Sequence, residues 1–170
     1  LALLTFVCGC RWYDKATGLL AGTIIATNFG YLAITHQALP DLPLAFFITL
    51  ATWAGLNFFS DSPTHKALAF LDRIVTVRRQ WLLLSTLALA AAFLTKGPIG
   101  IVLPFIVIVS VRICLLWSRR KSQGPRISFL EPLTLIDCAL AGLVFAVVAT
   151  PWYLAVTAVH GTEYLTSFFI

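Results

Sequence analysis

Lys96 is the residue whose type and setting point most directly to chemistry. It lies in the short run 94–98, where Gly97 ends one apolar stretch and Pro98 begins the next. A Gly after one helix and a Pro at the start of another are typical of a very tight turn. An ammonium held in such a turn could bind a phosphate, because Lys is a usual phosphate partner. The alternative is an anchor at a membrane interface.

Asp41 is the second candidate, and it lies between Pro40 and Pro43 just before another apolar stretch. A carboxylate held there could accept hydrogen bonds from a sugar or position a base. The alternative is structural, because an Asp near a Pro at a helix start is a good cap. Asp41 is therefore a supporting catalytic candidate, and Lys96 is a candidate phosphate-binding residue.

Four further residues are candidates for a substrate-binding loop. They are His36, Tyr153, Glu163 and Tyr164. Aromatic side chains at a membrane interface more often form the ordinary aromatic belt. Glu163 could act as a general base, although a single exposed carboxylate is usually only solvated.

The composition decides what kind of element can hold these side chains. Of 170 residues, 59% are hydrophobic and 11% are charged, and the mean hydropathy is +0.92. Soluble domains carry roughly 45–50% apolar and about 25% charged residues, so this chain cannot cover a soluble surface. An ordinary soluble domain, a disordered chain and a nucleic-acid-binding protein are excluded, and a membrane protein is indicated.

Six apolar runs predict the helices of an all-α, polytopic transmembrane bundle. The first run, 1–10, has about half the roughly 20 residues that a span needs. We interpret it as the end of a helix whose beginning is missing. The other runs are residues 17–35, 42–59, 81–95, 98–117 and 133–155, the last interrupted by Pro151. We expect part of one helix plus five spans, all within one transmembrane domain that covers residues 1–170.

The loops between these runs predict the orientation of the chain. Every basic residue except Lys96 falls in the first, third or fifth loop, or, for Arg112, just inside a span where it can snorkel. Positive charge is retained in the cytoplasm, so these loops should be cytoplasmic. Lys96 and Asp41 should then face outward.

Three other features are interpreted as structural. Residues 66–79 place most apolar side chains on one helical face, which is typical of a helix on the membrane surface; the alternative is an extension of the next span. Asp137, about one turn inside its span, is either a solvated helix end or a polar contact between helices. Gly18 and Gly22 are four residues apart and indicate close helix packing.

Sequence patterns of several other functions are absent. The chain has no phosphate-binding loop of nucleotide enzymes, no nucleophile elbow, and no His, Cys or Glu spacing suited to zinc. We therefore expect no metal and no cofactor. No ionisable residue lies at the middle of a span, where ion-coupled transporters usually carry one.

Four segments carry a family resemblance. They are residues 9–22, residues 38–47, residues 93–98 with 103–104, and residues 151–153 with 161, 164–165 and 168–169. These segments resemble motifs of the bacterial dolichyl-phosphate-mannose–protein mannosyltransferase-like family. They occur in the same order along the chain as in that family, and each lies on the expected side of the membrane. That family includes the lipid A aminoarabinose transferases.

The resemblance implies a C-type glycosyltransferase, a multi-helix membrane enzyme whose donor substrate is a polyprenyl-phosphate sugar. The sugar would pass to a lipid or protein acceptor on the periplasmic face of the bacterial cytoplasmic membrane, without any nucleic-acid partner. Family members place their principal acidic residue in the first outer loop, which would precede residue 1. We therefore expect this piece alone to be inactive. Relatives often carry a basic residue shortly before the outer-loop Asp, where this chain has His36.

Two other interpretations stay open. The chain could belong to a transporter or lipid flippase, although it shows no inverted repeat of broken helices. It could also be a non-catalytic membrane scaffold. That interpretation would not explain why the outward-facing ionisable residues lie in tight turns that contain Pro and Gly. An acidic pair in an outer loop before residue 1 would favour the enzyme.

Overall fold

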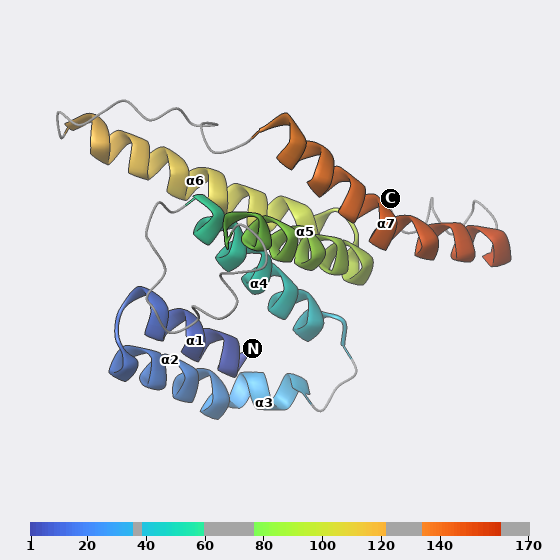
Figure 1. Cartoon of the computed structure of the whole chain (residues 1–170). Coiled ribbons are helices and arrows are strands. Elements are labelled where there is room, and N and C mark those ends of the chain that lie inside the picture. Colours follow the sequence, from blue (N-terminus) through green and yellow to red (C-terminus); the bar gives the residue numbers. More distant parts are fainter. Residues whose placement is uncertain (36–38, 60–76, 122–133, 161–170) are drawn as a thin grey trace.

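The secondary structure of the described residues is entirely helical. The computed structural model describes residues 1–35, 39–59, 77–121 and 134–160 (Figure 1). No strand occurs in these ranges, so the predicted all-α fold class is confirmed. The helices are α1 (Ala2–Trp12), α2 (Lys15–Thr27), α3 (Phe29–Thr35), α4 (Asp41–Phe59), α5 (Val77–Lys96), α6 (Ile99–Lys121) and α7 (Leu135–His160).

Helices α1 and α2 form a closely packed hairpin. The Asp14 carboxylate caps α2 by accepting a hydrogen bond of 2.6 Å from the Thr17 backbone N–H. That bond holds the pKa of Asp14 below its usual value. Gly18 is buried against α1, and a Cβ there would lie 2.6 Å from the backbone N of Cys10. The glycines four residues apart therefore let two helix backbones touch, as the sequence predicts.

The expected single span over 17–35 is wrong in one respect, because the helix breaks at Asn28. Its backbone is extended, with φ −66° and ψ 121°. The Asn28 side-chain oxygen accepts a hydrogen bond of 2.9 Å from the Tyr31 backbone N–H. Asn is a preferred N-cap, so it ends α2 and starts α3 in the same position.

Helices α4 and α5 form the core of the bundle. They are antiparallel, and both contain small residues that are buried: Ala51, Ala54 and Gly55 on α4, and Ser85, Ala88 and Ala92 on α5. The Ser85 hydroxyl donates a hydrogen bond of 2.9 Å to the Ala51 carbonyl across this contact. Trp53 and Trp81 pack edge to face nearby, with ring centroids 5.0 Å apart. Small residues permit the two helices to approach closely, and the two indole rings pack against each other toward one end of the contact.

The turn between α5 and α6 has the predicted form. Gly97 adopts φ 70° directly after Lys96, and its backbone N–H donates to the Phe93 carbonyl at 2.8 Å. Because a side chain is strained at that φ, Gly97 is the natural end of α5. Helix α6 then returns along α5 so closely that a Cβ on Gly100 would lie 2.5 Å from the Ala92 carbonyl.

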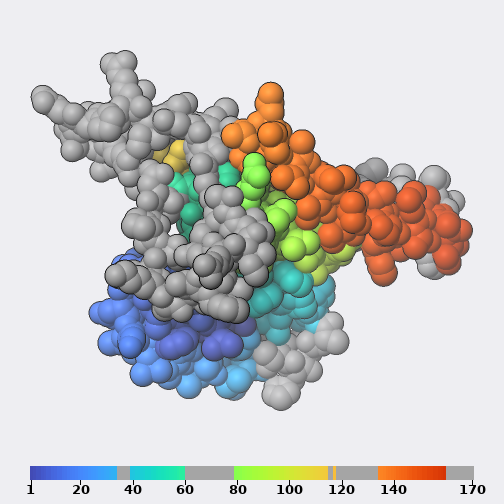
Figure 2. All heavy atoms as spheres, viewed as in Figure 1, coloured from blue at the N-terminus to red at the C-terminus, as the bar shows by residue number. Residues whose placement is uncertain are grey.

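Helix α7 continues through Pro151, the proline that lies within the predicted run 133–155. It runs to His160 and contains that proline in its interior. A proline inside a membrane helix is tolerated where neighbouring groups satisfy the freed backbone carbonyl. The end of α7 extends past the other coloured helices, as the space-filling view shows (Figure 2).

Two of the described helices have the length and apolar composition to cross a membrane. They are Asp41–Phe59 in α4 and Leu135–Val159 in α7. Ala2–Trp12 and Ile99–Cys114 are shorter apolar helices. Most of the stretch 66–79, with its expected surface helix, lies outside the described residues, and residues 77–79 belong to α5.

Gly18→Ala should lower the thermal unfolding midpoint of the whole protein in detergent. The added methyl group must push α1 away from α2, which costs about 1–3 kcal/mol when a packed contact is overfilled. Gly142→Ala is the matched control, because a Cβ there meets nothing within 4 Å and Ala favours a helix over Gly. Equal midpoints in the two variants would contradict the hairpin packing described here.

Candidate functional site

The two residues that the sequence selects separately form an ion pair. The Lys96 ammonium donates to the Asp41 carboxylate, which joins the last residue of α5 to the first residue of α4. Their side chains are 49% and 51% exposed. Solvent, or a ligand, can therefore reach both charges.

The position of each charge suits the helix that carries it. Asp41 lies in the first turn of α4 and Lys96 in the last turn of α5, where the helix dipoles favour a negative and a positive charge. Asp41 binds Lys96 across the bundle; the alternative of Asp41 as a simple helix cap does not account for this contact. An exposed ion pair contributes only about 0–1 kcal/mol, so a stronger anion can displace or join the carboxylate.

Local structure fixes the Lys96 backbone. The Thr95 hydroxyl donates to the Ala92 carbonyl at 2.7 Å, and the Gly97 N–H caps the helix end. On the other side, the Leu44 N–H donates to the Pro40 carbonyl at 3.0 Å and starts α4. Both charged residues therefore stand on ordered helix ends.

Aromatic rings of α5 and α7 meet at the end of the bundle that carries this ion pair. Phe93 lies one helical turn before Lys96, and its ring centroid is 5.5 Å from that of Tyr153 and 5.5 Å from that of Phe145. The structure thus brings Tyr153, a predicted substrate-loop residue, to the end of the bundle that carries Lys96. The other three candidates of that kind, His36, Glu163 and Tyr164, lie outside the described residues.

Arginines gather at the opposite end of the bundle. Arg11 donates to the Asn57 side-chain oxygen at 3.1 Å and stacks 4.9 Å above the Trp81 ring. This contact attaches the α1–α2 hairpin to α4 and α5. Sequence reasoning missed it, because no local pattern relates Arg11 to residues so far along the chain.

Arg112 does not snorkel to the interface, contrary to expectation. It is 7% exposed. Its guanidinium donates to the Phe59 carbonyl at 3.5 Å and lies 4.8 Å from the Phe59 ring centroid. The last carbonyls of a helix have no partner within it and attract a cation, which explains why the charge turns toward α4.

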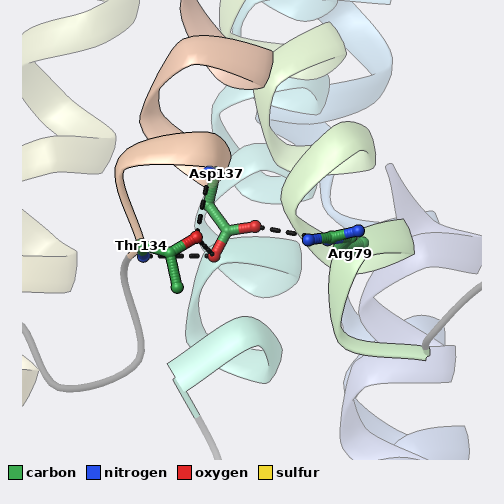
Figure 3. Close-up of polar contacts among 3 residues, drawn as sticks. All are labelled: Arg79, Thr134 and Asp137. Carbon is green, nitrogen blue, oxygen red and sulfur yellow. Dashed lines mark hydrogen bonds and ion pairs between the residues drawn. The ribbon is translucent and has the colours of Figure 1, made fainter.

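Asp137 is a polar contact between helices and not a solvated end. It is buried, and Arg79 Nε of α5 lies 3.4 Å from its Oδ1 (Figure 3). Its Oδ2 accepts hydrogen bonds from the Thr134 hydroxyl at 2.7 Å and the Thr134 N–H at 3.2 Å. The Asp137 N–H donates back to the Thr134 hydroxyl at 3.2 Å, which completes a capping box. Sequence reasoning did not predict this box, although the spacing of Thr134 and Asp137 before an apolar run is a sequence signal for it.

The charged contacts thus separate to the two ends of the helices, as the alternating loops predict. One end carries Lys96 with Asp41, and the other carries the arginines with Asp137. The first end offers an accessible cation beside a carboxylate and an aromatic wall, a set of groups that can bind a phosphate and a sugar. Among the described residues, no group of His, Cys, Asp or Glu could hold a metal ion.

Comparisons with known proteins bear on the family of the chain. An uncharacterized protein of Aquifex aeolicus (strain VF5) is 35% identical over 91 residues, which are 54% of this chain and 15% of the relative. The match therefore spans only a small part of that relative's length. No solved structure matches the chain. Residues 1–165 match the family described as dolichyl-phosphate-mannose-protein mannosyltransferase. The chain therefore belongs to this family.

Proposed function

We propose that the chain forms part of a membrane glycosyltransferase that takes its sugar from a polyprenyl-phosphate donor and works on the outer face of the membrane. The ion pair between Lys96 and Asp41 carries this proposal. It supplies a fixed, accessible cation at one end of an apolar bundle, where a lipid-borne phosphate would lie.

Lys96 binds the donor phosphate in this proposal. The acceptor attacks the anomeric carbon, the bond from that carbon to the phosphate oxygen breaks, and the lipid phosphate leaves with the bonding electrons. Negative charge on the departing phosphate grows as the bond breaks. A fixed ammonium therefore stabilises the transition state more than the bound donor, which is the requirement for catalysis. The acceptor proton passes to the acidic residue expected before residue 1.

Asp41 acts through Lys96. With no donor bound, the carboxylate keeps the ammonium over the end of α5 and neutralises it. When a phosphate arrives, it brings more negative charge than one carboxylate and can share the ammonium. Asp41 then limits the directions in which the flexible Lys side chain can point, and orientation of this kind accounts for a large part of catalytic rate.

The alternative as a transporter or lipid flippase has less support. Coupling sites of transporters lie near the membrane midplane, on broken helices. The described ion pairs lie at the ends of α4, α5 and α7. The proposed reaction needs two partners, a lipid-linked sugar donor and an acceptor that is a lipid or a protein. In this proposal the reaction uses no metal or cofactor.

The outward placement of the site is tested by thiol labelling of the whole protein in intact cells. In a background without native cysteines, Leu39→Cys should react with an impermeant maleimide from outside and Lys15→Cys should not, because positive loops stay in the cytoplasm. Both positions are exposed in the structure. Labelling of position 15 alone would reverse the orientation and remove the site from the outer face.

Lys96→Ala should lower turnover of the whole enzyme by roughly 10²-fold, the usual scale for losing one electrostatic stabiliser. Lys96→Arg should recover only part of the rate, because a planar guanidinium does not occupy the same space. The measurement is turnover per correctly inserted molecule with a lipid-linked sugar as donor. Lys15→Ala is the control, since Lys15 lies on the exposed start of α2. Unchanged turnover of Lys96→Ala would rule out the phosphate-binding role.

A further inference from the structure

Helix α7 is attached to the bundle at two separated places. Among its described residues only Asp137 and Ala149 are buried, whereas large apolar side chains such as Leu143, Val147 and Leu154 are exposed. Its main packing partner is α5. Much of the α7 surface therefore lies outside the bundle, and two specific side-chain contacts join α7 to α5 at separate places.

The first attachment is a ring of α5 that lies between two rings of α7. Phe93 is within 5.5 Å, centroid to centroid, of both Phe145 and Tyr153. These two are eight residues apart, about 12 Å along a helix. Ala149 lies midway between them in sequence and is 5% exposed, so a small side chain leaves room there. A ring held between two others fixes how far α7 is shifted along α5.

The second attachment is the ion pair of Asp137 with Arg79. The Asp137 side chain is 8% exposed, and its Oδ1 has no hydrogen-bond partner among the described residues. Arg79 Nε, 3.4 Å away, supplies the positive charge that faces this oxygen. The Arg79 side chain is 46% exposed, but the carboxylate is buried, and a buried charge with no opposite charge facing it is unfavourable. The carboxylate is therefore held to Arg79 as long as Asp137 stays buried.

The two attachments together define the direction of α7. Arg79 and Phe93 are 14 residues apart on α5, which corresponds to about 21 Å along the helix axis. Each attachment therefore acts on a different part of the contact between α5 and α7. With both in place, the end of α7 that carries Tyr153 stays beside the last turn of α5, which ends at Lys96.

We propose that the ion pair of Arg79 and Asp137 is a positioning element for the site at the opposite end of the bundle, because it aligns α7 so that Tyr153 stays against Phe93 in the last turn of α5, which ends at Lys96. Thr134 supports it, since the capping box holds Asp137 Oδ2 and leaves Oδ1 directed at Arg79 (Figure 3). Arg79 and Asp137 touch no substrate, and their effect passes through α7. The catalytic part of this inference rests on the proposed function, whereas the placement of α7 does not.

The placement is tested by a distance measurement between spin labels on the whole protein. Labels at Leu154→Cys on α7 and Val102→Cys on α6, in a background without native cysteines, sit on exposed side chains and leave Phe93 and Tyr153 intact. In Arg79→Gln the mean distance should move, or its distribution should at least double in width. Arg79→Lys should keep the parent distribution, because the contact uses a single nitrogen and not the planar fork.

Arg11→Gln is the matched control. It removes an arginine from the same end of the bundle, but one that contacts Asn57 and Trp81 and not α7. Its label distance should equal that of the parent protein. Asp137→Asn gives a second test of the pair: combined with Arg79→Gln, it should change the distance no more than either variant alone, because both remove the same interaction.

The catalytic consequence has its own measurement. Arg79→Gln should lower kcat/KM for the lipid-linked sugar about 10-fold or more, since a displacement near 1 Å can cost up to about 10²-fold; Arg79→Lys should restore most of it. An unchanged label distance in Arg79→Gln would overturn the inference. A changed distance with unchanged kcat/KM would overturn the link to the site. If the parent enzyme transfers no lipid-linked sugar, the proposed function fails and the distances still decide the placement.

Discussion

Small side chains along α4 and α5 let these two helix backbones approach closely, and the remaining helices are arranged around that contact. Ala51 accepts a hydrogen bond from Ser85 in the middle of it, so neither helix can slide along the other without losing a buried bond. At one end two Trp rings meet, and at the other Lys96 meets Asp41. The site is therefore a consequence of the register of α4 on α5.

The distribution of charge follows from the same arrangement. A charged group is costly among apolar helices unless a partner faces it, so each described arginine contact is to an oxygen, a carboxylate or an aromatic face. Arg112 uses the free carbonyl at the end of α4, and Arg79 uses the carboxylate at the start of α7. Both contacts lie at the end of the bundle away from Lys96, and in our proposal the effect of the Arg79 pair passes through α7 toward the site.

Local patterns predict the elements and the turn, and tertiary contacts decide the rest. The tight turn at Gly97 follows from a positive φ that only Gly adopts without strain, so the sequence is sufficient there. The break at Asn28 depends on a side-chain cap, which hydropathy does not record. Lys96 and Asp41 are both recognisable as candidates, but their pairing joins residues 55 apart and only the packed bundle shows it.

The central claim is that Asp41 acts by holding Lys96, and a double-mutant cycle on turnover tests it most directly. Turnover per inserted molecule would be compared for the parent enzyme, Asp41→Asn, Lys96→Ala and the double variant, with a lipid-linked sugar as donor. If the pair works as one unit, Asp41→Asn lowers turnover in the parent and has no further effect once Lys96 is Ala. Independent losses that multiply in the double variant would show that Asp41 does not act through Lys96, and would contradict the account.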